Sequence, residues 1–177
     1  LDRANGCGLM RSITLVIGLG EDRSHWPYVE SFLQEHSLDR VTIYALRPVK
    51  GTPYEHGPSS QDLAWWIAKV RVTFPKVEII AGTAEYRILE IPLLLEAGAN
   101  ALTKLPATKM FNTSQARQIK EFVKGAGRSW VSDLEHPDPF SAADWDALID
   151  GLSLSDEEKG QVKEVLMRYL KLMAARV

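Results

Sequence analysis

The stretch that most constrains the fold is residues 13–21, Ile-Thr-Leu-Val-Ile-Gly-Leu-Gly-Glu. A continuous apolar and β-branched run that stops at a turn signal predicts a strand buried on both faces. Gly18 and Gly20 permit positive φ angles and a close approach of the backbone to a bound molecule. Glu21 places a carboxylate after the strand, where α/β enzymes hold their ligand contacts. A tight turn with a solvated Glu21 is an equally good interpretation of this stretch alone.

The pattern of a strand followed by a helix occurs four times. Expected strands cover residues 13–18, 41–46, 77–81 and 101–105, and apolar residues at helical spacing follow each one. This repetition predicts an α/β fold with parallel strands and right-handed crossovers. Four such βα units are half of a TIM-like (β/α)8 barrel. Because a free half barrel leaves apolar strand edges open, either another chain or segment completes it, or the strands form an open sheet.

The composition changes after about Trp130. Residues 132–140 form a proline-bearing linker, and Ser141–Asp144 and Ser155–Glu158 both have the spacing of a capping box that opens a helix. We therefore expect the α/β region at residues 1–130. A linker and a two-helix C-terminal extension are expected at residues 131–177.

Charge and cysteine content narrow the class of protein. The chain has 21 Lys and Arg residues against 23 Asp and Glu residues, so no electrostatic footprint for nucleic acid or an anionic membrane is present. No apolar run approaches the roughly 20 residues that span a bilayer. The single cysteine, Cys7, fits a reducing, cytoplasmic setting. The histidines are not paired at metal-ligand spacing, so we expect no metal site and a small molecule as the ligand.

Side chains capable of chemistry follow the expected strands: Glu21, Arg47, Thr83, Glu85 and Lys104. Lys104 is the only candidate catalytic residue, because a buried lysine with a lowered pKa can form a Schiff base, as in an aldolase-type barrel. The alternative is that Lys104 is an anion clamp or is simply solvated.

Residues 14–21 resemble the fifth-strand motif Gly-x-Ile-x-Gly-x-x-Glu of radical S-adenosylmethionine enzymes. Val16, Gly18 and Glu21 match the motif, with valine in place of isoleucine. Thr14 departs from it, because it stands where the first glycine is expected.

Three later segments resemble the biotin synthase branch of these enzymes, in the same order. Residues 46–53 are similar to its sixth-strand segment with a Val-x-Gly-Thr-Pro core, residues 80–85 to its seventh strand, and residues 97–100 to the approach to its eighth. Thr83 stands where biotin synthase has an arginine that ligates an auxiliary two-iron cluster. This departure argues against biotin synthase itself and leaves lipoate-synthase-like, maturase-like and other members open.

The resemblance implies strands five to eight of a radical S-adenosylmethionine barrel. It implies five positions for contact with adenosylmethionine: Val16, Gly18, Gly20, Glu21 and Val49. Arg47 and Lys104 would bind an anionic substrate tail through charge-assisted hydrogen bonds, with Thr83 and Glu85 beside the substrate. The alternative for either cation is a structural ion pair with Glu85 or Glu21.

One element of the family is absent from this sequence. The family holds its four-iron four-sulfur cluster through Cys-x3-Cys-x2-Cys after the first strand, whereas this chain has only Cys7, which precedes the expected fifth strand. We therefore expect a C-terminal portion of a longer enzyme, or a subunit completed by a cluster-bearing partner. Whether the chain alone is an enzyme stays open. An aldolase-type lyase using Lys104 and a non-catalytic accessory module are the alternatives.

Overall fold

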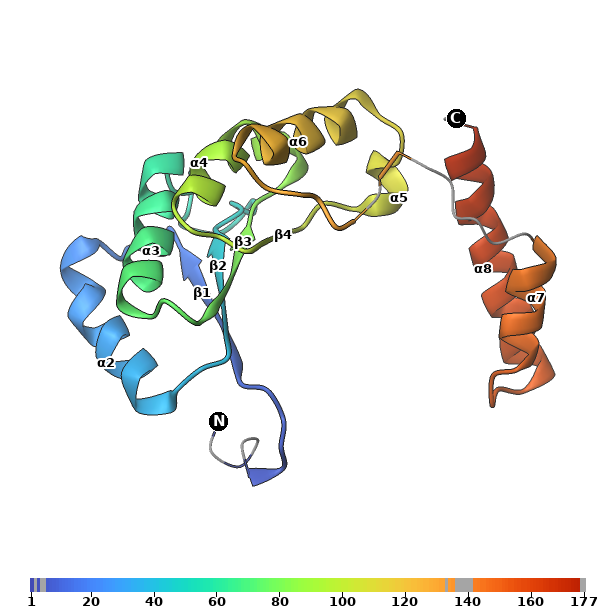
Figure 1. The fold of residues 1–177 in the computed structure, drawn as a ribbon, viewed down its shortest axis with the longest axis horizontal. Coiled ribbons are helices and arrows are strands. Elements are labelled where there is room, and N and C mark those ends of the chain that lie inside the picture. Colours follow the sequence, from blue (N-terminus) through green and yellow to red (C-terminus); the bar gives the residue numbers. More distant parts are fainter. Residues whose placement is uncertain (2, 4–5, 133, 136–141, 176–177) are drawn as a thin grey trace. The chain divides into compact units, whose positions relative to one another are not determined.

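The computed structural model describes residues 1, 3, 6–132, 134–135 and 142–175 (Figure 1). Its strands are β1 (Ser12–Ile17), β2 (Arg40–Ala45), β3 (Glu78–Gly82) and β4 (Ala101–Thr103). Two 3-10 helices are η1 (Arg23–His25) and η2 (Glu85–Glu90). The α-helices are α2 (Trp26–His36), α3 (Ser60–Thr73), α4 (Ile91–Glu96), α5 (Ala107–Met110), α6 (Ser114–Gly125), α7 (Ala142–Asp150) and α8 (Asp156–Ala174).

The four strands form one parallel sheet in the order β1-β2-β3-β4. This confirms the expected α/β fold with four parallel strands and helices at the C-terminal end. The sheet is not closed: within the described residues, β1 pairs with β2 alone and β4 with β3 alone. In the register of the sheet, Thr14 lies beside Thr42, and Tyr44 lies beside Gly82.

Helices cover one face of the sheet. The core contains Val41, Ile43, Ile79 and Ala81 from the strands and Leu33, Ile67, Val70 and Leu94 from α2, α3 and α4. On the other face, Thr14 is exposed and Thr42 and Tyr44 are partly exposed. The expectation that residues 13–18 are buried on both faces is therefore wrong, because the described chain supplies helices to one face only.

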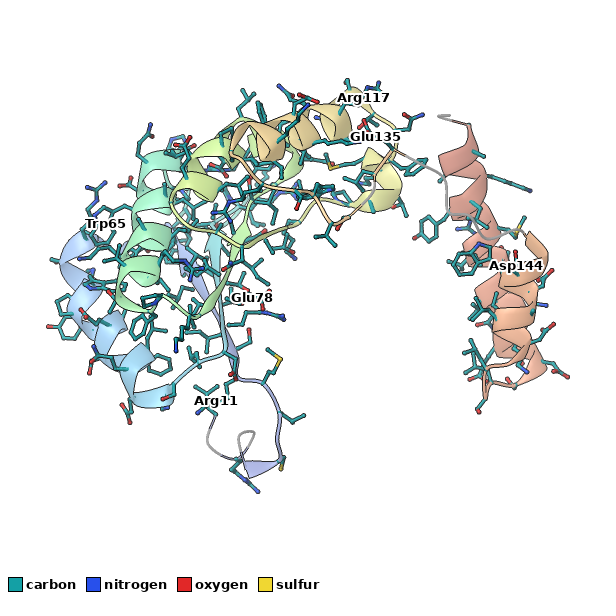
Figure 2. All side chains as sticks on the ribbon, in the orientation of Figure 1. Arg11, Trp65, Glu78, Arg117, Glu135 and Asp144 are labelled. Atoms are coloured by element: carbon teal, nitrogen blue, oxygen red, sulfur yellow. The ribbon has the colours of Figure 1, made fainter. Side chains whose placement is uncertain are left out.

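Three tryptophans pack α2 against α3. The Trp26 ring lies 6.1 Å from the Trp66 ring, and the Trp65 ring lies 5.1 Å from the Trp66 ring, measured between centroids (Figure 2 labels Trp65). Such large rings contribute both apolar burial and specific edge-to-face contacts. The cluster thus holds α2 and α3 together.

The described residues form two compact units. Residues 1–105 and 122–128 make up the strand unit, and residues 106–121 and 129–177 make up the helical unit. In the helical unit, Lys163 of α8 forms ion pairs with Asp146 and Asp150 of α7, with N–O distances of 3.2 and 3.0 Å. The boundary expected near residue 130 stays a prediction, and this grouping places α5 and the first part of α6 with the C-terminal helices.

The helix ends agree only in part with the capping residues expected from the sequence. Ser59 caps α3, and Ser155 with Glu158 forms the expected capping box ahead of α8. Asp22 caps η1, which leads into α2, because its side chain accepts from the Ser24 backbone N–H. Thr113 caps α6, because its hydroxyl accepts from Ala116 N. Ser141 lies outside the described residues.

Gly82 is required by the packing of Tyr44. A Cβ atom at residue 82 would stand 2.8 Å from Tyr44 Cα and 3.0 Å from Tyr44 Cβ, closer than real Cβ contacts come. We expect Gly82→Ala to lower the free energy of unfolding by about 2–3 kcal/mol, as overpacking does in other sheets. Denaturant unfolding followed by circular dichroism measures this. Gly125→Ala, which meets no atom within 4 Å, is the control and should change stability little.

Candidate functional site

The carboxylate of Glu21 folds back onto the turn that follows β1. Its Oε1 accepts from Gly18 N at 2.6 Å, and its Oε2 accepts from Leu19 N at 2.8 Å. Gly18 has a φ of +112°, and a Cβ there would stand 3.0 Å from both Leu46 Cβ and Pro58 Cδ. Glu21 therefore shapes the turn with its own charge, and only glycine fits at residue 18.

A cavity of about 430 Å³ lies beside this turn. Val16, Gly20 and Glu21 line it, together with His25 and Trp66. A Cβ at Gly20 would meet no atom within 4 Å, so the space beside that residue is open to a bound molecule. The volume lies within the range of small-molecule pockets. Three of the five expected adenosylmethionine contacts thus share one cavity.

The two candidates after β2 lie on an exposed turn. Arg47 is exposed and forms no ion pair with any described residue. Val49 is 62% exposed, and its carbonyl accepts from the Thr52 backbone N–H and hydroxyl at 3.1 and 2.7 Å. Neither residue lines the cavity beside Gly20. Val49 is nevertheless available to pack against a flat ring.

Thr83 is part of a buried hydrogen-bond network around Glu90. It is 1% exposed, and its hydroxyl donates to Glu90 Oε1 at 2.6 Å. Arg87 donates to both carboxylate oxygens of Glu90, at 2.9 and 2.6 Å, and Ser60 donates to Oε2 at 2.9 Å. The Thr83 side chain is therefore already committed to an internal hydrogen bond, whereas Glu85 is exposed and has no ion pair among the described residues.

A second cavity, also of about 430 Å³, lies on the sheet face that the helices leave open. Its lining is Thr14, Thr42, Tyr44, Ile80, Thr103 and Lys104. The Lys104 ammonium lies 5.7 Å from the centroid of the Tyr44 ring. Lys104 is exposed, so the described residues do not provide the burial that a Schiff-base lysine requires.

The two cavities separate the sequence candidates into groups. Val16, Gly20 and Glu21 meet at the first cavity, and Lys104 belongs to the second. Sequence reasoning missed the threonines and Tyr44 of the second cavity. The signal was present, because Thr14, Thr42 and Tyr44 alternate with apolar residues along β1 and β2.

No group of three or more His, Cys, Asp or Glu side chains among the described residues is arranged to hold a metal ion. None of the described helices combines the length and the apolar character needed to cross a bilayer.

Comparison with known proteins gives two matches. Residues 42–129 match the Biotin and Thiamin Synthesis associated domain, BATS, which is found in radical S-adenosylmethionine enzymes such as biotin synthase. An uncharacterised protein of Methanocaldococcus jannaschii is 36% identical over 128 residues, which cover 71% of this chain and 36% of that protein's length. The chain thus matches about a third of this relative. The BATS match includes every residue of the open-face cavity except Thr14, and it excludes the turn at Gly18.

Proposed function

We propose that this chain is the adenosylmethionine- and substrate-binding half of a radical S-adenosylmethionine enzyme related to biotin and lipoate synthases. The observation that carries the proposal is the open sheet face. Four parallel strands, of which β2, β3 and β4 lie in the region that matches BATS, have helices on one side and a polar cavity on the other. This is the arrangement of half a barrel whose lumen is completed by further βα units.

The turn after β1 suits the cofactor. Gly20 leaves open space, Val16 offers a β-branched side chain, and the cavity has the volume of a small-molecule site. Glu21 fixes the backbone that a nucleoside would approach. Gly18 and Val49 complete the proposed contact set, Gly18 through its backbone and Val49 through its exposed side chain.

The iron–sulfur cluster does not fit this chain. Such clusters are held by several cysteine thiolates, and the sequence contains only Cys7, which is exposed. If another half supplied the cluster, adenosylmethionine bound there would provide the chemistry for hydrogen abstraction from an unactivated carbon. In this proposal the residues of this chain bind and orient the cofactor and the substrate. Glu21 shapes the cofactor turn, and Arg47, Glu85 and Lys104 follow the C-terminal ends of β2, β3 and β4, where the substrate would bind.

The test is reconstitution. The chain is co-expressed with, or joined to, a half barrel that carries Cys-x3-Cys-x2-Cys, and the assembly is loaded with iron and sulfide and reduced. We expect adenosylmethionine to be cleaved to 5′-deoxyadenosine and methionine. A folded, cluster-loaded assembly that neither binds nor cleaves adenosylmethionine would overturn the proposal.

A variant of Glu21 tests the cofactor turn. In Glu21→Gln the amide has one acceptor oxygen, so either Gly18 N or Leu19 N loses its partner. We expect adenosylmethionine to bind the assembly about tenfold more weakly by calorimetry, because a charge-assisted hydrogen bond is replaced. Glu55→Gln, at an exposed residue outside both cavities, is the matched control. Equal affinities of Glu21→Gln and the control would exclude this role.

A further inference from the structure

The open-face cavity has an unusual set of polar groups. Thr14, Thr42, Thr103 and Tyr44 bring four hydroxyl groups from three strands, and Lys104 brings one ammonium group. No carboxylate lines the cavity. Thr42 adjoins Thr14 in the sheet, and Tyr44 lies one pleat further along β2. The hydroxyls therefore occupy successive levels of one sheet face.

These groups form no hydrogen bond or ion pair in the described part of the protein, and the contact of Lys104 with the Tyr44 ring is the interaction recorded among them. None of the three threonine hydroxyls, nor the Tyr44 phenol, forms a hydrogen bond with a described residue, and Lys104 forms no ion pair there. The carboxylate of Glu21 already accepts two backbone N–H groups. The cavity consequently has spare donors, spare acceptors and an uncompensated positive charge.

The positions of Lys104 and Tyr44 are fixed by the fold. Lys104 has a φ of +67°, a backbone conformation that residues other than glycine rarely adopt and that often marks a functional position. Its ammonium is held over the Tyr44 ring, and that ring lies across Gly82, where no side chain fits. The ammonium group thus lies against Tyr44, in the cavity that the threonines also line.

If this face were covered, its hydroxyl groups and the Lys104 ammonium would need hydrogen-bond and ion-pair partners. If a second half barrel closes over the sheet, as the proposed function requires, the hydroxyls and the ammonium lose most of their water. A buried polar group without a hydrogen bond and a buried charge without a counter-charge are both costly. A ligand that fills the lumen must therefore satisfy the hydroxyls and neutralise Lys104.

We propose that the substrate of this site is a small anionic molecule rich in hydrogen-bonding groups, with its carboxylate or phosphate on Lys104 and its polar groups along Thr14, Thr42 and Thr103. This inference rests on the proposed role of the strand unit as the substrate-binding half. It excludes a purely apolar acyl chain and a cationic substrate as good ligands.

The test uses the full chain with threonine methyl groups labelled for NMR and four probes. Gluconate and glucose 6-phosphate carry hydroxyls with a carboxylate or a phosphate, hexanoate lacks the hydroxyls, and glucosamine reverses the charge. We expect gluconate or glucose 6-phosphate to shift the methyl signals of Thr14, Thr42 and Thr103. The probe that binds more tightly shows whether the site prefers a carboxylate or a phosphate. Shifts of equal size with hexanoate or glucosamine would overturn the proposal.

Two variants locate the binding. Lys104→Met should weaken binding of the tighter anionic probe about tenfold, because a charge-assisted contact is lost. Thr42→Val should weaken binding of the same probe severalfold. Lys50→Met, at an exposed lysine outside the cavity, should bind the probe as the parent does. An unchanged dissociation constant in Lys104→Met would exclude the assignment.

The two proposals fail in distinguishable ways. Threonine shifts with an anionic probe, in a chain whose cluster-loaded assembly does not bind adenosylmethionine, would support the anion site and reject the enzyme class. An assembly that cleaves adenosylmethionine, in a chain whose threonines ignore both anionic probes, would support the enzyme class and reject the substrate class.

Discussion

Glu90→Ala is expected to lower the free energy of unfolding of the strand unit by about 3–5 kcal/mol, the usual cost of removing one partner from a buried ion pair. Glu90 is 5% exposed and accepts hydrogen bonds from Thr83, Arg87 and Ser60. Its removal leaves the Arg87 guanidinium in a largely buried position without a counter-charge. Denaturant unfolding and hydrogen exchange of the β3 amides measure the loss.

The controls for this prediction separate charge from packing. Glu85→Ala removes an exposed carboxylate five residues away and should change stability by less than about 0.5 kcal/mol. The double variant Arg87→Ala with Glu90→Ala should be more stable than the sum of the single losses implies, because no charge is left unpaired. Full additivity in that double variant would contradict the assignment of Glu90 as the counter-charge.

Arg71→Leu is expected to be the second most destabilising change, with a loss of about 3 kcal/mol. All five N–H groups of Arg71 donate to acceptors around the end of α3 and the turn before β4. The acceptors are the carbonyls of Pro75 (2.7 Å), Val77 (2.9 Å) and Gly98 (3.1 and 3.0 Å), and the side-chain oxygen of Asn100. Burial, and secondly the neighbouring Arg128 guanidinium, lower the pKa of Arg71.

Local hydrogen exchange is the sharpest measurement for Arg71. Asn100 N donates to Ile79 O at 2.7 Å, and Ile79 N donates to the Asn100 side chain at 2.9 Å, so both amides report on this turn. Arg71→Lys should lose most of the same stability, because an ammonium group cannot reproduce the planar fork. Arg23→Ala, which removes an exposed ion pair with Asp62, should cost no more than about 1 kcal/mol. Protected Ile79 and Asn100 amides in Arg71→Leu would contradict the prediction.

The strands were predictable because the evidence for them is local. Apolar β-branched runs and the helical spacing between them gave four strands whose ends lie within two residues of those in the structure. The open face was harder to predict, because the alternation of Thr14, Thr42 and Tyr44 with apolar residues is compatible with more than one environment. Thr14 and Thr42 fit a strand on either a buried or a solvated face, and a single sequence does not reveal how many layers of helices pack against the sheet.

The residues that hold the site together were harder to foresee than the residues at its surface. Glu90 stands between Leu89 and Ile91 in an apolar stretch, a position that signals a buried charge, yet its partners Thr83 and Ser60 come from other elements.

The network around Glu90 also extends to the first strand. Pro58, whose carbonyl accepts from Arg87 Nη1 at 3.0 Å, is one of the two residues, with Leu46, that close the space at Gly18. Gly18, Pro58, Arg87, Glu90 and Thr83 therefore form one connected network that reaches from the end of β1 to the end of β3. In protein engineering the residues of this network would have to be transplanted or redesigned together. The threonines of the open face are not part of this network, so the preference for a ligand can be altered there one residue at a time.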